Sequence, residues 1–345
     1  MYVNPANRRV VTLALTLVLL VVLVTVGSFV TVPYVSVGPG PTLNTLAKNG
    51  SKDVVMIKGA STRATDGHLN LTTVSVTSKL TLFQALGSWF SGRDAVEPRE
   101  IYFPPDKSPK EVRENDLQQM GGSESTATVA ALRYLKRPVA LSVGVDPKGP
   151  GSKALRSGDV VKAVNGRAVS TPNDLRTAIS GLTPGAVIVV DIVRAGTPMS
   201  VPVTLGARPD DKSKGYVGVT PQFVNADPSL TIDFNVDGIG GPSAGLMFTL
   251  AIIDKLGSVD LTGGKFIAGT GTMADDGDVG EIGGITHKMR AARDAGATAF
   301  LVPAGNCPEA LSDKPGGLTL YKVDKLDDAI TALAAIRGSG TAPRC

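Results

Sequence analysis

The chain lacks several residues and motifs that would place it in common functional classes. Its 345 residues contain only two histidines, two cysteines and one tryptophan. No C-x-x-C pair and no cluster of histidines occurs, so the sequence offers no metal site and predicts no cofactor. No G-x-x-x-x-G-K-[ST] loop occurs either, which excludes the usual phosphate-binding loop of ATP-hydrolysing modules.

A strong excess of one charge is also absent. The 35 lysines and arginines face 31 aspartates and glutamates, for a net charge of +4, and no basic stretch contains interleaved aromatic residues. Nucleic acid is therefore not an expected partner. The 42% hydrophobic content is enough for two or three modest domains with ample cores.

One long hydrophobic run lies near the N-terminus. Val10 to Val32 carries no charge and would form a helix about 34 Å long, enough to cross a bilayer. We expect an uncleaved single-span anchor in preference to a buried helix or a cleavable signal, although Val26-Gly-Ser28 could satisfy a signal peptidase. Arg8 and Arg9 place the N-terminus in the cytoplasm, so the chain after about Pro33 is expected outside the cell membrane.

The main candidate for chemistry is the segment Asp237-Gly-Ile-Gly-Gly-Pro-Ser-Ala-Gly245. Alternating apolar residues over 230–236 precede it and an apolar run over 246–253 follows, so a strand, a glycine-rich turn and a helix should meet at Ser243. Pro242 suits the first position of that helix. The turn predicts a nucleophilic serine, or more plainly a serine that caps a helix. We expect three backbone amides to form an oxyanion hole, those of Gly241, Ser243 and Ala244.

A nucleophilic serine needs a base, and the chain offers few candidates. His287 is the only histidine after Ser243, and Lys288 follows it on a predicted helix. An α/β-hydrolase needs an acid and then a histidine in separate loops, which a single histidine serves poorly. Lysine is the other candidate base, provided that burial keeps its amine neutral.

Four ordered blocks resemble the proteolytic domain of Lon peptidases: Gly241–Gly245, Ile267–Gly271, Gly283–Lys288 and Phe300–Pro303. In that family the serine of P-S-A-G is the nucleophile, a lysine after the double glycine is its base, and a threonine supports the lysine. The resemblance assigns these roles to Ser243, Lys288 and Thr270. Gly240 and His287 stand where acidic residues are common in the family.

An earlier region, 67–73 together with 120–131, resembles the first half of the same fold. Thr72 or Thr73 stands there where many members have an acid. We expect a helix over 126–135. The intervening segment 89–116 mixes proline with charged residues and predicts an exposed excursion.

Residues from about Pro138 to Leu205 resemble a PDZ domain of the bacterial protease-linked kind, in preference to a generic small β-domain. The match rests on Leu155, Gly158, Asp159, Asn165 and Gly166. PDZ domains capture an extended peptide by strand addition. We expect the binding strand to lie at 141–144, with contacts from Leu141, Val143 and Gly144.

The predicted fold is an α/β (α+β) Lon-type proteolytic domain with an inserted PDZ β-domain and an N-terminal transmembrane helix. The expected segments are a cytoplasmic N-terminus 1–9, an anchor 10–32, a linker 33–50, a first Lon half 51–137, a PDZ domain 138–206, a catalytic half 207–338 and a tail 339–345. The exported location and the even cysteine count predict a disulfide between Cys307 and Cys345 over two free thiols.

The resemblance implies an ATP-independent, membrane-anchored serine endopeptidase that uses a Ser-Lys dyad on exported or membrane-associated proteins. Two alternatives remain open: an inactive, membrane-tethered PDZ adaptor, and a serine esterase that uses His287. The expected partners are protein or peptide substrates and the membrane, without nucleic acid or ATP. Homo-oligomeric rings are common among Lon domains.

Overall fold

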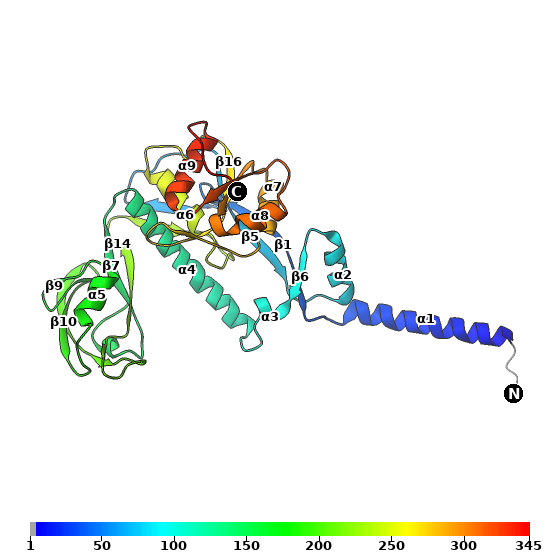
Figure 1. The fold of residues 1–345 in the computed structure, drawn as a ribbon, viewed down its shortest axis with the longest axis horizontal. Coiled ribbons are helices and arrows are strands. Elements are labelled where there is room, and N and C mark those ends of the chain that lie inside the picture. The colour runs from blue at the N-terminus through cyan, green and yellow to red at the C-terminus, as the bar shows by residue number, and fades with distance from the viewer. Residues whose placement is uncertain (1–4) are drawn as a thin grey trace.

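A computed structural model describes residues 5–345. Residues 1–4, which begin the predicted cytoplasmic segment 1–9, lie outside the described residues. The first element is helix α1 (Pro5–Phe29), which projects away from the rest of the chain (Figure 1). Its part from Arg8 to Phe29 contains an 18-residue stretch with a mean hydropathy of 2.9, and its length and composition fit either a membrane span or a signal sequence.

A six-stranded sheet forms the centre of the main body. In spatial order its strands are β20 (Thr319–Val323), β19 (Ala299–Pro303), β16 (Phe266–Gly269), β5 (His68–Thr77), β1 (Tyr34–Asn44) and β6 (Ala95–Pro98). The first four strands are parallel, and β1 runs antiparallel to both β5 and β6. Segments far apart in sequence thus share one sheet, as expected for a proteolytic fold interrupted by an insertion.

Helices cover both faces of this sheet. Side chains that alternate along β16 and β19 point to two separate cores, since Ile267 and Leu301 belong to one cluster while Ala268 and Phe300 belong to the other. The first core contains helices α6 (Gly245–Leu256), α4 (Pro109–Tyr134) and α9 (Leu326–Ile336). The second contains α7 (Ile285–Asp294) and α8 (Cys307–Ser312). The layers place α6 and α7 on opposite sides of the same strands.

The segment 89–116 has no buried residue, as expected for an exposed excursion, but it forms regular elements. It completes α2 (Leu82–Ser91), supplies edge strand β6 and the short helix α3 (Arg99–Tyr102), and begins the 26-residue helix α4. A capping box starts α4, because the Ser108 hydroxyl accepts from the Glu111 amide while the Glu111 carboxylate accepts from the Ser108 amide. The predicted helix over 126–135 is only the buried end of this longer helix.

A second, antiparallel sheet forms a separate unit beside the main body (Figure 1). Its strand order is β11 (Thr197–Thr204), β10 (Val187–Arg194), β8 (Asp159–Val164), β7 (Val139–Val145) and β14 (Val219–Asn225). This sheet and helix α5 (Pro172–Ile179) enclose their own core. Strand β14 lies beyond the boundary expected at residue 206, and its last residue, Asn225, pairs with Val139 at the start of β7. Both ends of the inserted unit are therefore adjacent.

Short elements complete the described chain. They are β2 (Lys48–Asn49), β3 (Lys52–Asp53), β4 (Val55–Lys58), β9 (Arg167–Ala168), β12 (Gly206–Ala207), β13 (Gly215–Tyr216), β15 (Thr231–Phe234), β17 (Thr272–Met273) and β18 (Val279–Gly280), with 3-10 turns at Pro150–Lys153 and Ala304–Asn306.

The C-terminus is fastened to the main body. Cys345 forms a disulfide with Cys307 at the start of α8, with a Cα–Cα distance of 5.2 Å. The adjoining residues Pro343 and Arg344 lie against β20, where the Lys322 amide donates to the Pro343 carbonyl.

Candidate active site

Ser243 lies in a turn immediately before helix α6. The helix begins at Gly245, with Ala244 as its N-cap, and not at Pro242 as we expected. The reason is tertiary: the Ser243 carbonyl accepts from the Gly271 amide (3.0 Å) and from the Thr270 hydroxyl (3.1 Å). A helix that began at Pro242 would use this carbonyl for its own first turn. The serine is therefore fixed by the segment after β16.

Lys288 is a buried amine on helix α7. Only 4% of the residue is exposed, and its Nζ donates to the Thr270 hydroxyl oxygen at 3.2 Å. Because the same hydroxyl donates to the Ser243 carbonyl, Thr270 connects α7 to the serine turn. The three residues assigned from the Lon resemblance are thus brought together from three separate elements.

Burial changes the acid–base behaviour of Lys288. Desolvation disfavours the ammonium form and lowers the pKa of Lys288 from 10.5 to about 8. With that pKa, about one amine in ten is neutral at pH 7. A neutral amine at this position can accept a proton near physiological pH.

Ser243 and Lys288 line one cleft of about 360 Å³. The other walls come from residues 72–76 of β5, Pro41 of β1, Met120 of α4 and the glycine-rich segment 238–240. Strand β16 pairs with β5 only from His68 to Leu71. Residues 72–76 of β5 therefore pair with β1 on one side, while their other edge is free of β16 at the cleft.

Helix α4 braces the serine turn, a role that the sequence did not suggest. The Gly241 amide donates to the Asp116 carbonyl at 3.0 Å, and the Ser123 hydroxyl donates to the Pro242 carbonyl at 3.1 Å. A Cβ atom on Gly240 would lie 2.8 Å from that of Asp116, so only glycine allows this approach. The partners in these contacts are more than a hundred positions apart, so no local sequence pattern marks them.

The same contacts correct the expected oxyanion hole. The amide of Gly241 is committed to Asp116 and is not directed at the cleft. Within residues 5–345, the amides of Ser243 and Ala244 have no hydrogen-bond acceptor. These two amides are therefore available to another acceptor.

His287 is placed differently from its neighbour. It is buried, with 8% of the residue exposed, and does not line the cleft that contains Ser243. Its Nδ1 atom has no partner among the described residues. Of the two adjacent residues, only Lys288 lines the cleft that contains Ser243.

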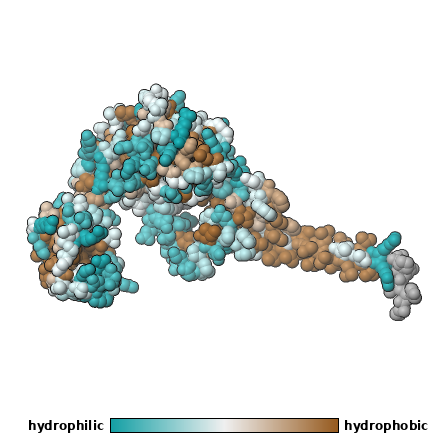
Figure 2. Space-filling view, in the orientation of Figure 1, coloured by the Kyte–Doolittle hydropathy of each residue, from teal (hydrophilic) through white to brown (hydrophobic). Residues whose placement is uncertain are grey.

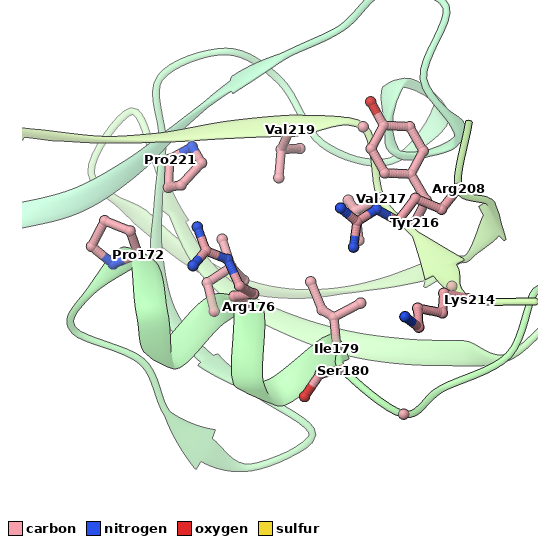
Figure 3. Close-up of a pocket in the computed structure, with 14 residues that line it drawn as sticks. Pro172, Arg176, Ile179, Ser180, Arg208, Lys214, Tyr216, Val217, Val219 and Pro221 are labelled. Carbon is pink, nitrogen blue, oxygen red and sulfur yellow. The ribbon is translucent and has the colours of Figure 1, made fainter. Parts of the chain in front are cut away.

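A second groove lies in the inserted unit, between helix α5 and strand β14 (Figure 3). It encloses about 670 Å³. Apolar side chains of Leu175 and Ile179 from α5 face Val219 and Pro221 from β14. Three cationic side chains also border it, those of Arg176, Arg208 and Lys214.

The expected peptide-binding strand at 141–144 is wrong. These residues belong to β7, which pairs with β14 along its whole length on one side and with β8 on the other. Leu141 and Val143 are buried in the core of the unit, and Gly144 pairs with Thr220. Because both edges of β7 are occupied there, a peptide cannot add to it. The edge strand beside α5 is β14.

Comparisons with known proteins find two families in this chain. Residues 118–205 match the PDZ domain family, and residues 237–335 match the Lon protease (S16) C-terminal proteolytic domain. The chain thus combines a PDZ domain with a Lon-type proteolytic domain.

Individual relatives match only part of this chain. A probable periplasmic serine endoprotease DegP-like from Brucella suis is 33% identical over 86 residues, which cover 25% of this chain and 17% of that protein. The archaeal Lon protease of Methanothermobacter thermautotrophicus is 35% identical over 101 residues, covering 29% of this chain and 15% of that protein. The matched regions therefore span less than a fifth of these curated relatives.

One similar solved structure is the PDZ domain of an SdrC-like protein from Listeria monocytogenes. It is 15% identical, covers 24% of this chain and 86% of that chain, and has a TM-score of 0.22.

Proposed function

We propose that this chain is a membrane-anchored serine endopeptidase that works without ATP and uses Ser243 as nucleophile and Lys288 as base. The observation that carries the proposal is the convergence of Ser243, Thr270 and a buried, pKa-lowered Lys288 at one cleft.

The chemistry follows from these positions. The neutral Lys288 amine takes the proton of the Ser243 hydroxyl as its oxygen attacks the substrate carbonyl. The tetrahedral intermediate places its oxyanion at the amides of Ser243 and Ala244. Lys288 then returns the proton to the leaving amine, and water hydrolyses the acyl-enzyme by the same route. Thr270 holds the lysine in line throughout. Among the described residues the Ser243 hydroxyl forms no hydrogen bond with Lys288, so the proposal requires the two groups to come within hydrogen-bond distance when substrate fills the cleft.

The free edge of β5 offers a way to hold the substrate. Residues 72–76 present one backbone edge to the cleft that contains Ser243. An extended peptide that pairs with this edge would bring its scissile carbonyl to the serine, and its specificity would be low because backbone groups supply most contacts.

The PDZ groove would select which chains reach the cleft. The Asp146 amide donates to the Gly218 carbonyl, so the backbone groups of Gly218 point toward the paired strand. Successive residues of a strand direct their backbone groups to alternate sides. The backbone groups that point toward the open side of β14 are therefore those of Val219, Pro221 and Phe223. Pro221 has no N–H, so a captured peptide pairs over a short length. The cations Arg176, Arg208 and Lys214 suit a peptide that ends there with its carboxylate.

Helix α1 is the proposed anchor. Its side chains from Arg8 to Val26 are exposed in the described chain, and lipid is the environment that such an apolar helix requires. Arg8 and Arg9 at its start favour a cytoplasmic N-terminus and a catalytic domain on the other side.

Purified full-length protein in detergent tests the proposal. Wild type should cleave an unfolded protein and short fluorogenic peptides without nucleotide, and Ser243→Ala should abolish both activities while it retains the fold. Equal hydrolysis by wild type and Ser243→Ala would refute the nucleophile. A wild type that binds peptides but cleaves none would instead support the adaptor function.

A further inference from the structure

Helix α2 carries an apolar face that points away from the protein core. Leu82, Phe83, Leu86, Trp89 and Phe90 follow the i, i+1, i+4, i+7, i+8 spacing of one helical face. Trp89 is 68% exposed and Phe90 is 81% exposed, whereas the α2 residue buried against the body is Ala85. An amphipathic helix ordinarily turns its apolar side inward. In α2 the apolar side faces away from the protein core instead.

The apolar face begins where the candidate membrane span ends. A Cβ atom on Gly27 of α1 would lie 2.7 Å from the Phe83 ring, so the two helices are in close contact. The Val32 amide donates to the Leu80 carbonyl and Thr31 pairs with Thr81, which fixes α2 beside the exit from α1. Figure 2 shows the hydrophobic surface of α1 continuing onto the adjoining part of the body.

We propose that α2 lies in the interface of the bilayer that α1 crosses, with Phe83, Trp89 and Phe90 inserted at the level of the lipid headgroups. This inference rests on the proposed membrane anchor. Lipid is the occupant that the structure favours, because the exposed face is continuous with a span that must itself be covered by lipid. Aromatic side chains are typical of this layer, and an amphipathic helix that lies in it buries its apolar face at the acyl boundary.

The polar side of α2 and its ends connect it to the proteolytic domain. The Ser88 hydroxyl lies 3.0 Å from that of Ser36 on β1. Beyond the end of α2, the carbonyls of Gly92 and Arg93 both accept from the Arg290 guanidinium of α7, at 2.8 and 2.9 Å. Arg93 also forms an ion pair with Asp294 at the end of α7. Insertion of α2 would therefore set the orientation of the whole domain on the membrane.

Trp89 is the single tryptophan of the chain, so its fluorescence reports directly on this face. Full-length protein would be reconstituted in phosphatidylcholine nanodiscs. We expect blue-shifted emission, strong quenching by brominated acyl chains and weak quenching by aqueous iodide. The matched control combines Trp89→Phe with Val259→Trp, because Val259 is an exposed residue in a loop after α6. Its tryptophan should show the opposite pattern, with several-fold stronger iodide quenching.

A variant tests the face itself. Phe83→Asp with Phe90→Asp should shift Trp89 emission to the red and raise its iodide quenching, while Leu311→Asp, a change at a half-exposed residue of α8, should alter neither. If iodide quenches Trp89 as strongly as the control tryptophan while the protein remains in the nanodisc, the docking of α2 is refuted and the anchor stands. Loss of protein from the nanodisc would refute the anchor and the docking together.

Discussion

The burial of Lys288 lowers the stability of the folded protein. Since burial lowers its pKa from 10.5 to about 8, keeping the amine in this environment at pH 7 costs about 3 kcal/mol of folding stability. The hydrogen bond to the Thr270 hydroxyl does not restore the solvation that a free ammonium has in water. A residue that destabilises the fold in this way is typical of a functional site.

The pH dependence of turnover should follow this amine. The reactive form is neutral, so kcat/KM should rise about tenfold from pH 7 to pH 9 with an apparent pKa of about 8. Lys288→Arg should be inactive across the range, because a guanidinium keeps its proton. Initial rates on a peptide substrate whose own charge is constant provide the measurement. A flat profile in wild type would contradict a lysine base.

Removal of the amine should separate stability from activity. Lys288→Met should be inactive and yet more stable than wild type, by up to about 3 kcal/mol at pH 7 and about 2 kcal/mol at pH 9. In the folded protein the Lys288 amine loses its proton above pH 8, whereas in the unfolded protein it keeps its proton until about pH 10.5. Wild type therefore gains stability as pH rises, and the stability difference between the variant and wild type becomes smaller. Urea unfolding at both pH values measures it. An increase in the difference with pH would contradict the lowered pKa.

The neighbouring His287 distinguishes the two candidate bases. His287→Ala should keep most peptide turnover, since the imidazole does not line the cleft, although loss of its packing should lower the melting temperature. Lys288→Ala should abolish turnover. The comparison requires folded, purified variants. An active Lys288→Ala beside an inactive His287→Ala would revive the esterase alternative.

Sequence reasoning reached some of these residues and missed others. The blocks around Ser243, Thr270 and Lys288 are each local and distinctive, and the structure brings all three together. The brace from Asp116 and Ser123 joins residues more than a hundred positions apart, and no local pattern marks it. The start of α6 was placed too early for the same reason, because tertiary hydrogen bonds took the carbonyl that the helix needed.

At the scale of elements, strand pairing decides which edge of the PDZ domain is open to a peptide. The resemblance to PDZ domains placed a strand at 141–144 but could not show that β14, from beyond the expected boundary, pairs along it. Helix α4 gives a similar lesson. The first half of this helix is polar and exposed, so it shows no helical repeat of apolar residues. The capping residues Ser108 and Glu111 are the sequence signal of its beginning.

The paired ends of the PDZ domain define a clean deletion. The Ala226 amide donates to the Pro138 carbonyl, so residues 138–226 can be replaced by a short Gly-Ser bridge with little strain on the flanking chain. We expect unchanged hydrolysis of short peptides and slower cleavage of proteins that the groove captures, because tethering raises their local concentration. Kinetics on both substrate types test this.

A point variant provides the matched control for that deletion. Val219→Asp places a carboxylate in the groove and should mimic the deletion on captured proteins without removal of the domain. Equal loss of peptide and protein cleavage in both variants would indicate a structural role for the PDZ domain instead.

For the whole molecule, the C-terminal disulfide should contribute to global stability. Cys307 and Cys345 are 38 residues apart, and closing such a loop stabilises the fold by about 3 to 4 kcal/mol in the chain-entropy model. Cys345→Ser should therefore lower the urea midpoint, and reduction of wild type should lower it by a similar amount. Mass mapping of unreduced protein from its native compartment checks the bond. Two free thiols there would exclude the disulfide.

The contacts that join α7 to the end of α2 have a consequence for where substrates are cut. The helix that carries Lys288 is fastened through Arg290 to Gly92 and Arg93. With α1 as anchor and α2 at the bilayer, the cleft then stands at a constant height above the lipid. For a substrate that is itself embedded in the membrane, the cleaved bond is the one that reaches this height. The position of cleavage in such a substrate would thus depend on its distance from the bilayer more than on its sequence.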